Sequence, residues 1–203
     1  NLLASLALLK ELNLNLEKIK NIFQNYKPTE GRGSKHNIKR YNRLKKFNLS
    51  DDDYIFLKKK ARKLKIKVLA TPLTEDKVKL AASFGEVVKV ASGDINFYPT
   101  IDEIIKMKKK IILSTGNATL KEIDKTVNYI QRKNNKISNS LALLHCVSTY
   151  PTLIENANIK KISLLKKRYP KLTIGYSNHC CEKEAVLSAV ALGAKIVEVH
   201  IPN

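Results

Sequence analysis

The chain has 203 residues, a formal net charge of +20, 43% hydrophobic residues and 28% charged residues. This length and apolar content suffice for one domain with a sizeable core, and no apolar run approaches the roughly 20 residues that a membrane-spanning helix needs. The positive charge favours an anionic, phosphorylated substrate, whereas lysines spread along the chain, with no basic tract interleaved with aromatic residues, argue against a nucleic-acid-binding protein.

The first predicted elements are weakly patterned. Leucines at helical spacing predict a helix over residues 2–13, and residues 20–26 fit a short strand. Proline and glycine predict a loop over residues 28–34. Ser50 followed by three aspartates predicts the start of a helix that runs to about residue 63, because serine is a preferred N-cap and acidic residues favour the first turn.

From residue 67 onward, short apolar strands alternate with helices. The strands are predicted over 67–71, 87–91, 111–114, 141–145, 173–176 and 194–200, and the helices over 74–83, 100–108, 119–132, 159–168 and 182–192. Such alternation predicts an α/β fold with a parallel sheet. Since no glycine-rich dinucleotide turn follows a strand, we expect a (β/α)8 TIM-type barrel that lacks its first strand and last helix, rather than a doubly wound sheet.

Two histidines follow the last two predicted strands. His179 and His200 are separated by a predicted helix, so in a parallel barrel both lie at the carboxyl ends of neighbouring strands. Barrels build their active sites at that end, and two neutral imidazoles there can hold a divalent metal ion. His145 also ends an apolar strand, but we expect it to be a packed side chain rather than a ligand.

Hydroxyl groups, a lysine and a carboxylate lie at or shortly after the ends of the predicted strands. They are Thr71, Lys89, Ser92, Asp94, Ser114, Thr115, Ser148, Tyr150 and Ser177. A single serine or threonine at a strand end is usually a cap, but together these groups can donate hydrogen bonds to the oxygens of a phosphate. Cys146, Cys180 and Cys181 have no CxxC spacing, which predicts neither a zinc site nor a disulfide framework and favours a reduced, cytoplasmic setting.

Six motifs occur in an order that resembles the N-acetylneuraminate (sialic acid) synthase family over about residues 60–201. They are Ala70-Thr71-Pro72, KVASGD at 89–94, LSTG at 113–116, LHCVSTYPT at 144–152, GYSNH at 175–179, and ALGAK at 191–195 followed by His200. The resemblance implies a transferase that condenses phosphoenolpyruvate with an N-acyl mannosamine-type sugar aldehyde. It also implies release of phosphate and a requirement for Mn²⁺ or Mg²⁺.

The resemblance also implies residue roles. His179 and His200 look like the metal ligands, and Asp94 looks like the catalytic carboxylate that handles the aldehyde proton or the attacking water. The residues similar to substrate-binding positions of the family are Thr71, Lys89, Ser92, Ser114, Ser148 and Ser177 for phosphoenolpyruvate, and Tyr150 and Gln24 for the sugar. Asn178 replaces an aspartate of the family motif, and since a carboxylate next to a metal-binding imidazole raises its basicity, we expect weaker metal affinity.

The resemblance further implies that residues 1–203 form a single partial barrel domain, without the family's C-terminal antifreeze-like domain. We expect no membrane partner and no nucleic acid; a homo-oligomer or a second chain that completes the barrel stays open. The alternative function is a degenerate, non-catalytic relative that serves as a binding or assembly subunit. The motifs do not distinguish sialic, legionaminic and pseudaminic acid synthases.

Overall fold

The computed structural model describes residues 49–134 and 139–200. These residues fall into two compact units that divide between Ile66 and Lys67. Gln24, the helix predicted over 2–13 and the strand predicted over 20–26 lie outside the described residues. None of the helices described has both the length and the apolar character needed to cross a bilayer.

The first unit contains the helix α3 (Asp51–Lys63). Ser50 caps it reciprocally, because its Oγ accepts from the Asp53 amide at 3.2 Å while the Asp53 carboxylate accepts from the Ser50 amide at 2.7 Å. The Ser50 hydroxyl also donates to the Asp53 carboxylate at 2.7 Å, and this bond, together with that from the Ser50 amide, lowers the pKa of Asp53. The N-cap predicted from Ser50 and the acidic run is therefore confirmed.

The second unit is a parallel α/β half-barrel. Its five strands are hydrogen-bonded in the order β1-β2-β3-β4-β5 and all neighbouring pairs are parallel. The strands are β1 (Val87–Val90), β2 (Lys110–Ser114), β3 (Leu141–Cys146), β4 (Thr173–Ser177) and β5 (Val197–Glu198). The predicted parallel sheet with intervening helices is confirmed; the full eight-stranded barrel stays a prediction.

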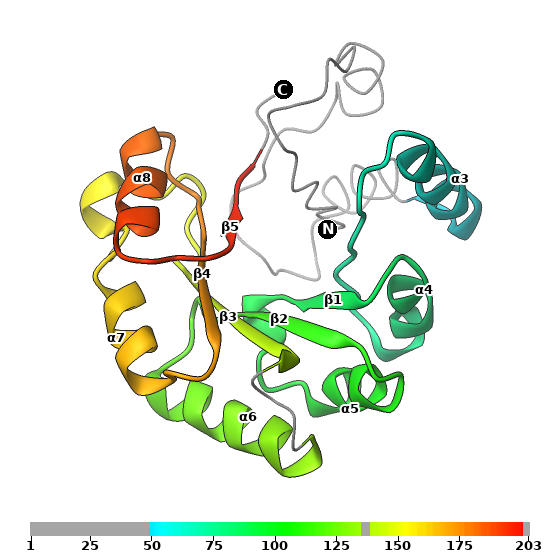
Figure 1. Cartoon of the computed structure of the whole chain (residues 1–203), viewed down its shortest axis with the longest axis horizontal. Coiled ribbons are helices and arrows are strands. Elements are labelled where there is room, and N and C mark those ends of the chain that lie inside the picture. The colour runs from blue at the N-terminus through cyan, green and yellow to red at the C-terminus, as the bar shows by residue number, and fades with distance from the viewer. Residues whose placement is uncertain (1–48, 135–138, 201–203) are drawn as a thin grey trace, which may run out of the picture. The chain divides into compact units, whose positions relative to one another are not determined.

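The helices lie outside this sheet, as Figure 1 shows. They are α4 (Val78–Ser83), which follows the 3-10 turn η1 (Glu75–Lys77), α5 (Tyr98–Lys106), α6 (Leu120–Lys133), α7 (Lys161–Arg168) and α8 (Lys183–Ala191). The central strand β3 is buried at every position, and helix residues such as Ile101, Ile130 and Ile162 complete the core. Continuous apolar strands are expected when both faces of a sheet are covered.

A glycine sets the approach of the last two strands. A Cβ atom at Gly175 of β4 would lie 2.5 Å from the Ile196 carbonyl oxygen and 2.5 Å from Leu144 Cδ2. Glycine therefore lets β4 pack between β3 and the segment that leads into β5, and this packing brings His179 and His200 to one edge.

Two predicted strands differ from the structure. Residues 67–71 do not form a strand. Among the described residues, a single backbone hydrogen bond links them to β1, from the Lys89 amide to the Ala70 carbonyl at 3.2 Å. The strand predicted over 194–200 shortens to β5, although the Lys195 amide already donates to the Ile174 carbonyl at 2.8 Å. In both cases the apolar pattern is present, but the pairing that defines a strand depends on a neighbour distant in sequence.

Candidate functional site

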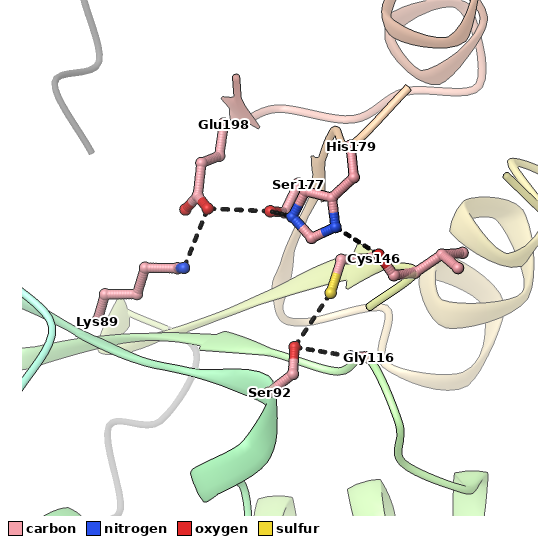
Figure 2. Close-up of polar contacts among 8 residues, drawn as sticks. Lys89, Ser92, Gly116, Cys146, Ser177, His179 and Glu198 are labelled. Atoms are coloured by element: carbon pink, nitrogen blue, oxygen red, sulfur yellow. Dashed lines mark hydrogen bonds and ion pairs between the residues drawn. The ribbon is translucent and has the colours of Figure 1, made fainter. Parts of the chain in front are cut away.

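A buried ion pair links the first and last strands of the sheet, β1 and β5. Lys89 of β1 donates from Nζ to Oε1 of Glu198 in β5 at 3.0 Å, and the two side chains are 8% and 11% exposed. Ser177 of β4 donates to the same carboxylate oxygen at 2.9 Å. Figure 2 shows the lysine, the carboxylate and the hydroxyl converging. These three side chains come from three different strands, so they meet only when the sheet has formed.

His179 is held as a neutral imidazole. Its Nδ1 donates to the Val147 carbonyl oxygen, which leaves the lone pair on Nε2. Ser177 Oγ lies 3.5 Å from Nε2, but its single proton goes to Glu198. Burial lowers the pKa of His179 to about 4, against the opposing effect of the Val147 hydrogen bond. At neutral pH this ring therefore presents an unprotonated nitrogen, as a metal ligand requires.

His200 and Tyr150 complete a cluster of three rings. The ring centroids of His179 and His200 are 5.1 Å apart, and the Tyr150 ring lies 3.8 Å and 5.2 Å from them. Loss of hydration lowers the pKa of His200 as well. The sheet thus brings together the two predicted metal ligands and one predicted sugar-binding residue.

The donor set fits a divalent ion that takes part of its shell from elsewhere. Among the described residues no group of three or more histidine, cysteine, aspartate or glutamate side chains has a metal-binding arrangement. Two imidazoles can supply two ligands, and Mn²⁺ and Mg²⁺ accept oxygen ligands from substrate or water in the remaining positions.

Two predicted phosphate-binding hydroxyls are buried without a partner. Within the described part of the chain, Thr71 Oγ1 and Ser114 Oγ make no hydrogen bond, although these residues are only 5% and 2% exposed. A buried polar atom without a partner costs free energy, so such atoms often await a ligand or water. Ser114 ends β2, and Thr71 lies next to Ala70, which accepts from the Lys89 amide.

Ser92 and Ser148 meet around Gly116. The Gly116 amide donates to Ser92 Oγ at 3.0 Å, and Cys146 Sγ lies 3.0 Å from the same oxygen. A Cβ atom on Gly116 would lie 2.4 Å from Ser148 Oγ. Asp94 lies in the adjoining 3-10 turn η2 (Ser92–Asp94), directly after β1, and is partly buried.

The side chain of Asn178 forms hydrogen bonds within the turn that contains His179. Its Oδ1 accepts from Tyr176 Oη at 3.0 Å and from the Cys180 amide at 3.1 Å, and its Nδ2 donates to the Cys180 carbonyl at 2.9 Å. The imidazole of His179 is instead oriented by Val147. The amide of Asn178 therefore stabilises the turn around His179, and the weaker metal affinity expected from this residue stays a prediction.

Glu198 is the site residue that sequence reasoning missed. It lies two positions before His200, on the same face of the strand predicted over 194–200, and a lone carboxylate in an apolar run was the available signal. His145, by contrast, is a packed side chain as expected, with its Nε2 2.9 Å from the Ala157 carbonyl oxygen and 2% exposure.

Comparisons with known proteins show the family of this chain. The sequence matches the NeuB family over residues 6–202. It is 40% identical to N,N'-diacetyllegionaminic acid synthase of Campylobacter jejuni over 141 residues, covering 69% of this chain and 42% of that protein. It is 31% identical to N-acetylneuraminate-9-phosphate synthase of Drosophila melanogaster over 154 residues, covering 74% of this chain and 40% of that protein.

Solved structures show the same fold. N-acetylneuraminic acid (sialic acid) synthetase from Leptospira borgpetersenii superposes with a TM-score of 0.75 at 32% identity, over 83% of this chain and 58% of that one. A truncated 3-deoxy-D-arabino-heptulosonate 7-phosphate synthase from Thermotoga maritima shares the fold alone, with a TM-score of 0.59 at 18% identity, over 75% of this chain and 60% of that one. The chain spans less than half the length of the curated relatives it matches. The chain belongs to the NeuB family.

Proposed function

We propose that this chain carries the catalytic barrel of a nonulosonic acid synthase, which condenses phosphoenolpyruvate with an N-acyl mannosamine-type sugar and releases phosphate. Relatives named for the synthesis of legionaminic, pseudaminic and N-acetylneuraminate-type acids support this reaction class. The observation that carries it is a single sheet edge that combines a buried lysine, unpartnered hydroxyls and two neutral imidazoles.

The anionic substrate fits the donors of β1, β2 and β4. Lys89 has three N–H donors, so it can bind a carboxylate or phosphate oxygen while it keeps its bond to Glu198. Thr71 and Ser114 gain a partner that they lack among residues 49–134 and 139–200. The other hydroxyls proposed to contact phosphoenolpyruvate are those of Ser92, Ser148 and Ser177. A site rich in donors and low in water binds an anion more strongly than the same groups in solution.

Bond formation joins C3 of phosphoenolpyruvate to the aldehyde carbon of the sugar, and water then attacks C2 as the C–O bond to phosphate breaks. His179 and His200 would hold Mn²⁺ or Mg²⁺, which when bound polarises the aldehyde oxygen. Asp94, which is similar to the family's catalytic carboxylate, is proposed to move a proton at that oxygen or at the attacking water. Tyr150 and Gln24 are proposed to contact the sugar.

The finer architecture is also proposed. Residues 1–203 form one partial (β/α)8 barrel, whose edge is completed by further chain, by a second copy or by a complementing subunit. Covering the edge strands of the half-barrel is favoured physically, because open strand edges promote aggregation.

Thermal melts with and without ligands test the function. We expect Mn²⁺ together with phosphoenolpyruvate to raise the melting temperature, since a ligand that binds only the native state stabilises it by about 2.7 kcal/mol at a hundredfold excess over its dissociation constant. His179→Ala and His200→Ala should abolish the Mn²⁺ response and the metal-dependent turnover, while Ser163→Ala, at an exposed position on α7, should retain both. A wild-type melt indifferent to both ligands would overturn the proposal and favour the non-catalytic relative.

A further inference from the structure

Three successive strands end at one small junction in the site, formed by Ser92, Gly116 and Cys146. Ser92 Oγ lies 3.0 Å from the Gly116 amide nitrogen and 3.0 Å from Cys146 Sγ. A Cβ atom on Gly116 would lie 2.5 Å from Cys146 Sγ and 2.9 Å from Ser92 Oγ, so glycine is what allows this contact. Figure 2 shows the thiol and the hydroxyl facing each other.

The hydrogen-bonding capacity of Ser92 limits what it can do. A hydroxyl has one proton to donate and two lone pairs to accept with. One lone pair accepts from the Gly116 amide. If the hydroxyl donates to Cys146, no proton remains for an anion. If the thiol donates to the second lone pair instead, the Ser92 proton is free for a phosphate oxygen.

The junction favours a protonated thiol. Cys146 is 6% exposed, and this burial raises the pKa of the thiol, although the hydrogen bond between Ser92 and Cys146 opposes the shift. The charges of Lys89 and Glu198 also act on the thiol, in opposite directions, which places Cys146 within electrostatic reach of the ion pair. A thiol that keeps its proton can act as donor or acceptor toward Ser92.

We propose that Cys146 is a positioning residue for anion binding: its thiol donates to Ser92 Oγ when the Ser92 hydroxyl turns its proton to the phosphoryl group of the substrate. This inference rests on the proposed function, because it takes phosphoenolpyruvate as the anion that Ser92 contacts. Cys146 itself touches no substrate; it acts through the direction of one hydroxyl proton.

A matched pair of variants separates the hydrogen bond from packing. Cys146→Ser keeps a donor and an acceptor, Cys146→Ala keeps neither, and both leave nearly the same void. We expect Cys146→Ser to bind phosphoenolpyruvate within about twofold of the wild type. We expect Cys146→Ala to lose roughly two- to tenfold in affinity by titration calorimetry, the range that one net hydrogen bond supports. Cys181→Ala, at an exposed thiol, controls for the loss of a cysteine.

A double-mutant cycle supplies a readout that a purely structural role would not move. In a Ser92→Ala background, Cys146→Ala should cause no further loss of affinity, because the thiol acts only through the serine hydroxyl. Equal affinities of Cys146→Ala and Cys146→Ser, or additive losses in the cycle, overturn the inference. If the wild type binds no phosphoenolpyruvate, the proposed function fails. The same double-mutant cycle is then measured on unfolding free energy, and a coupling of zero between Ser92 and Cys146 would show that their hydrogen bond does not form.

Discussion

Neutralising Glu198 tests whether the ion pair with Lys89 stabilises the sheet edge. Glu198→Gln removes the negative charge but keeps an amide oxygen that can accept from Lys89 and Ser177. At the observed 3.0 Å separation, Coulomb's law with an effective dielectric constant of about 20 gives roughly 5 kcal/mol for the pair. Because the neutral hydrogen bond remains, and the charged pair had itself lost hydration, we expect a net loss of about 3 kcal/mol in unfolding free energy.

The assay is urea unfolding at pH 7, followed by circular dichroism, on Glu198→Gln, Lys89→Met and the double variant. Each single variant removes one charge of the buried pair and leaves the other charge without its partner. The double variant removes both charges. We therefore expect the double variant to lose far less stability than the two single losses added together, with a coupling of roughly 3 kcal/mol. A loss below about 1 kcal/mol in Glu198→Gln, or additive single losses, would refute the claim that the two charges are buried as a mutually dependent pair.

Two further predictions concern the chain around His179. Asn178→Asp should lower the unfolding free energy by about 1–3 kcal/mol, because it replaces the Nδ2 donor to the Cys180 carbonyl with a carboxylate oxygen. Thermal melts and Mn²⁺ titration check this prediction. Tighter metal binding without loss of stability would contradict it. Without metal, stability should fall as the pH decreases from about 6.5 to about 4. Over that window the unfolded chain binds a proton at His179 that the folded chain does not bind, because folding lowers the pKa of His179 from 6.5 to about 4. At 1.36 kcal/mol per pKa unit, the loss of unfolding free energy is roughly 3 kcal/mol. His179→Gln should flatten this part of the stability profile in urea titrations, and an unchanged slope would show that other groups set it.

Much of the fold follows from local pattern. The strands β1 to β4 and the helices α5 to α8 lie where apolar runs and helical periodicity predict them, because each pattern reflects which face of an element is buried. The Ser50 cap is equally local, since the side chain and the amide that it binds are three residues apart. The spacing of His179 and His200 after consecutive strands likewise sufficed to predict that they share one edge.

Tertiary structure decided what depends on neighbours distant in sequence. Lys89 and Glu198 are 109 positions apart, and nothing near either residue specifies the other as its partner. The same is true of the Val147 carbonyl that selects the tautomer of His179, and of the thiol of Cys146 beside Ser92. A sequence determines which residue types end each strand, because propensity and periodicity act over a few residues. The parallel register then brings the strand ends together. This tertiary packing decides which of those side chains form hydrogen bonds or ion pairs with one another.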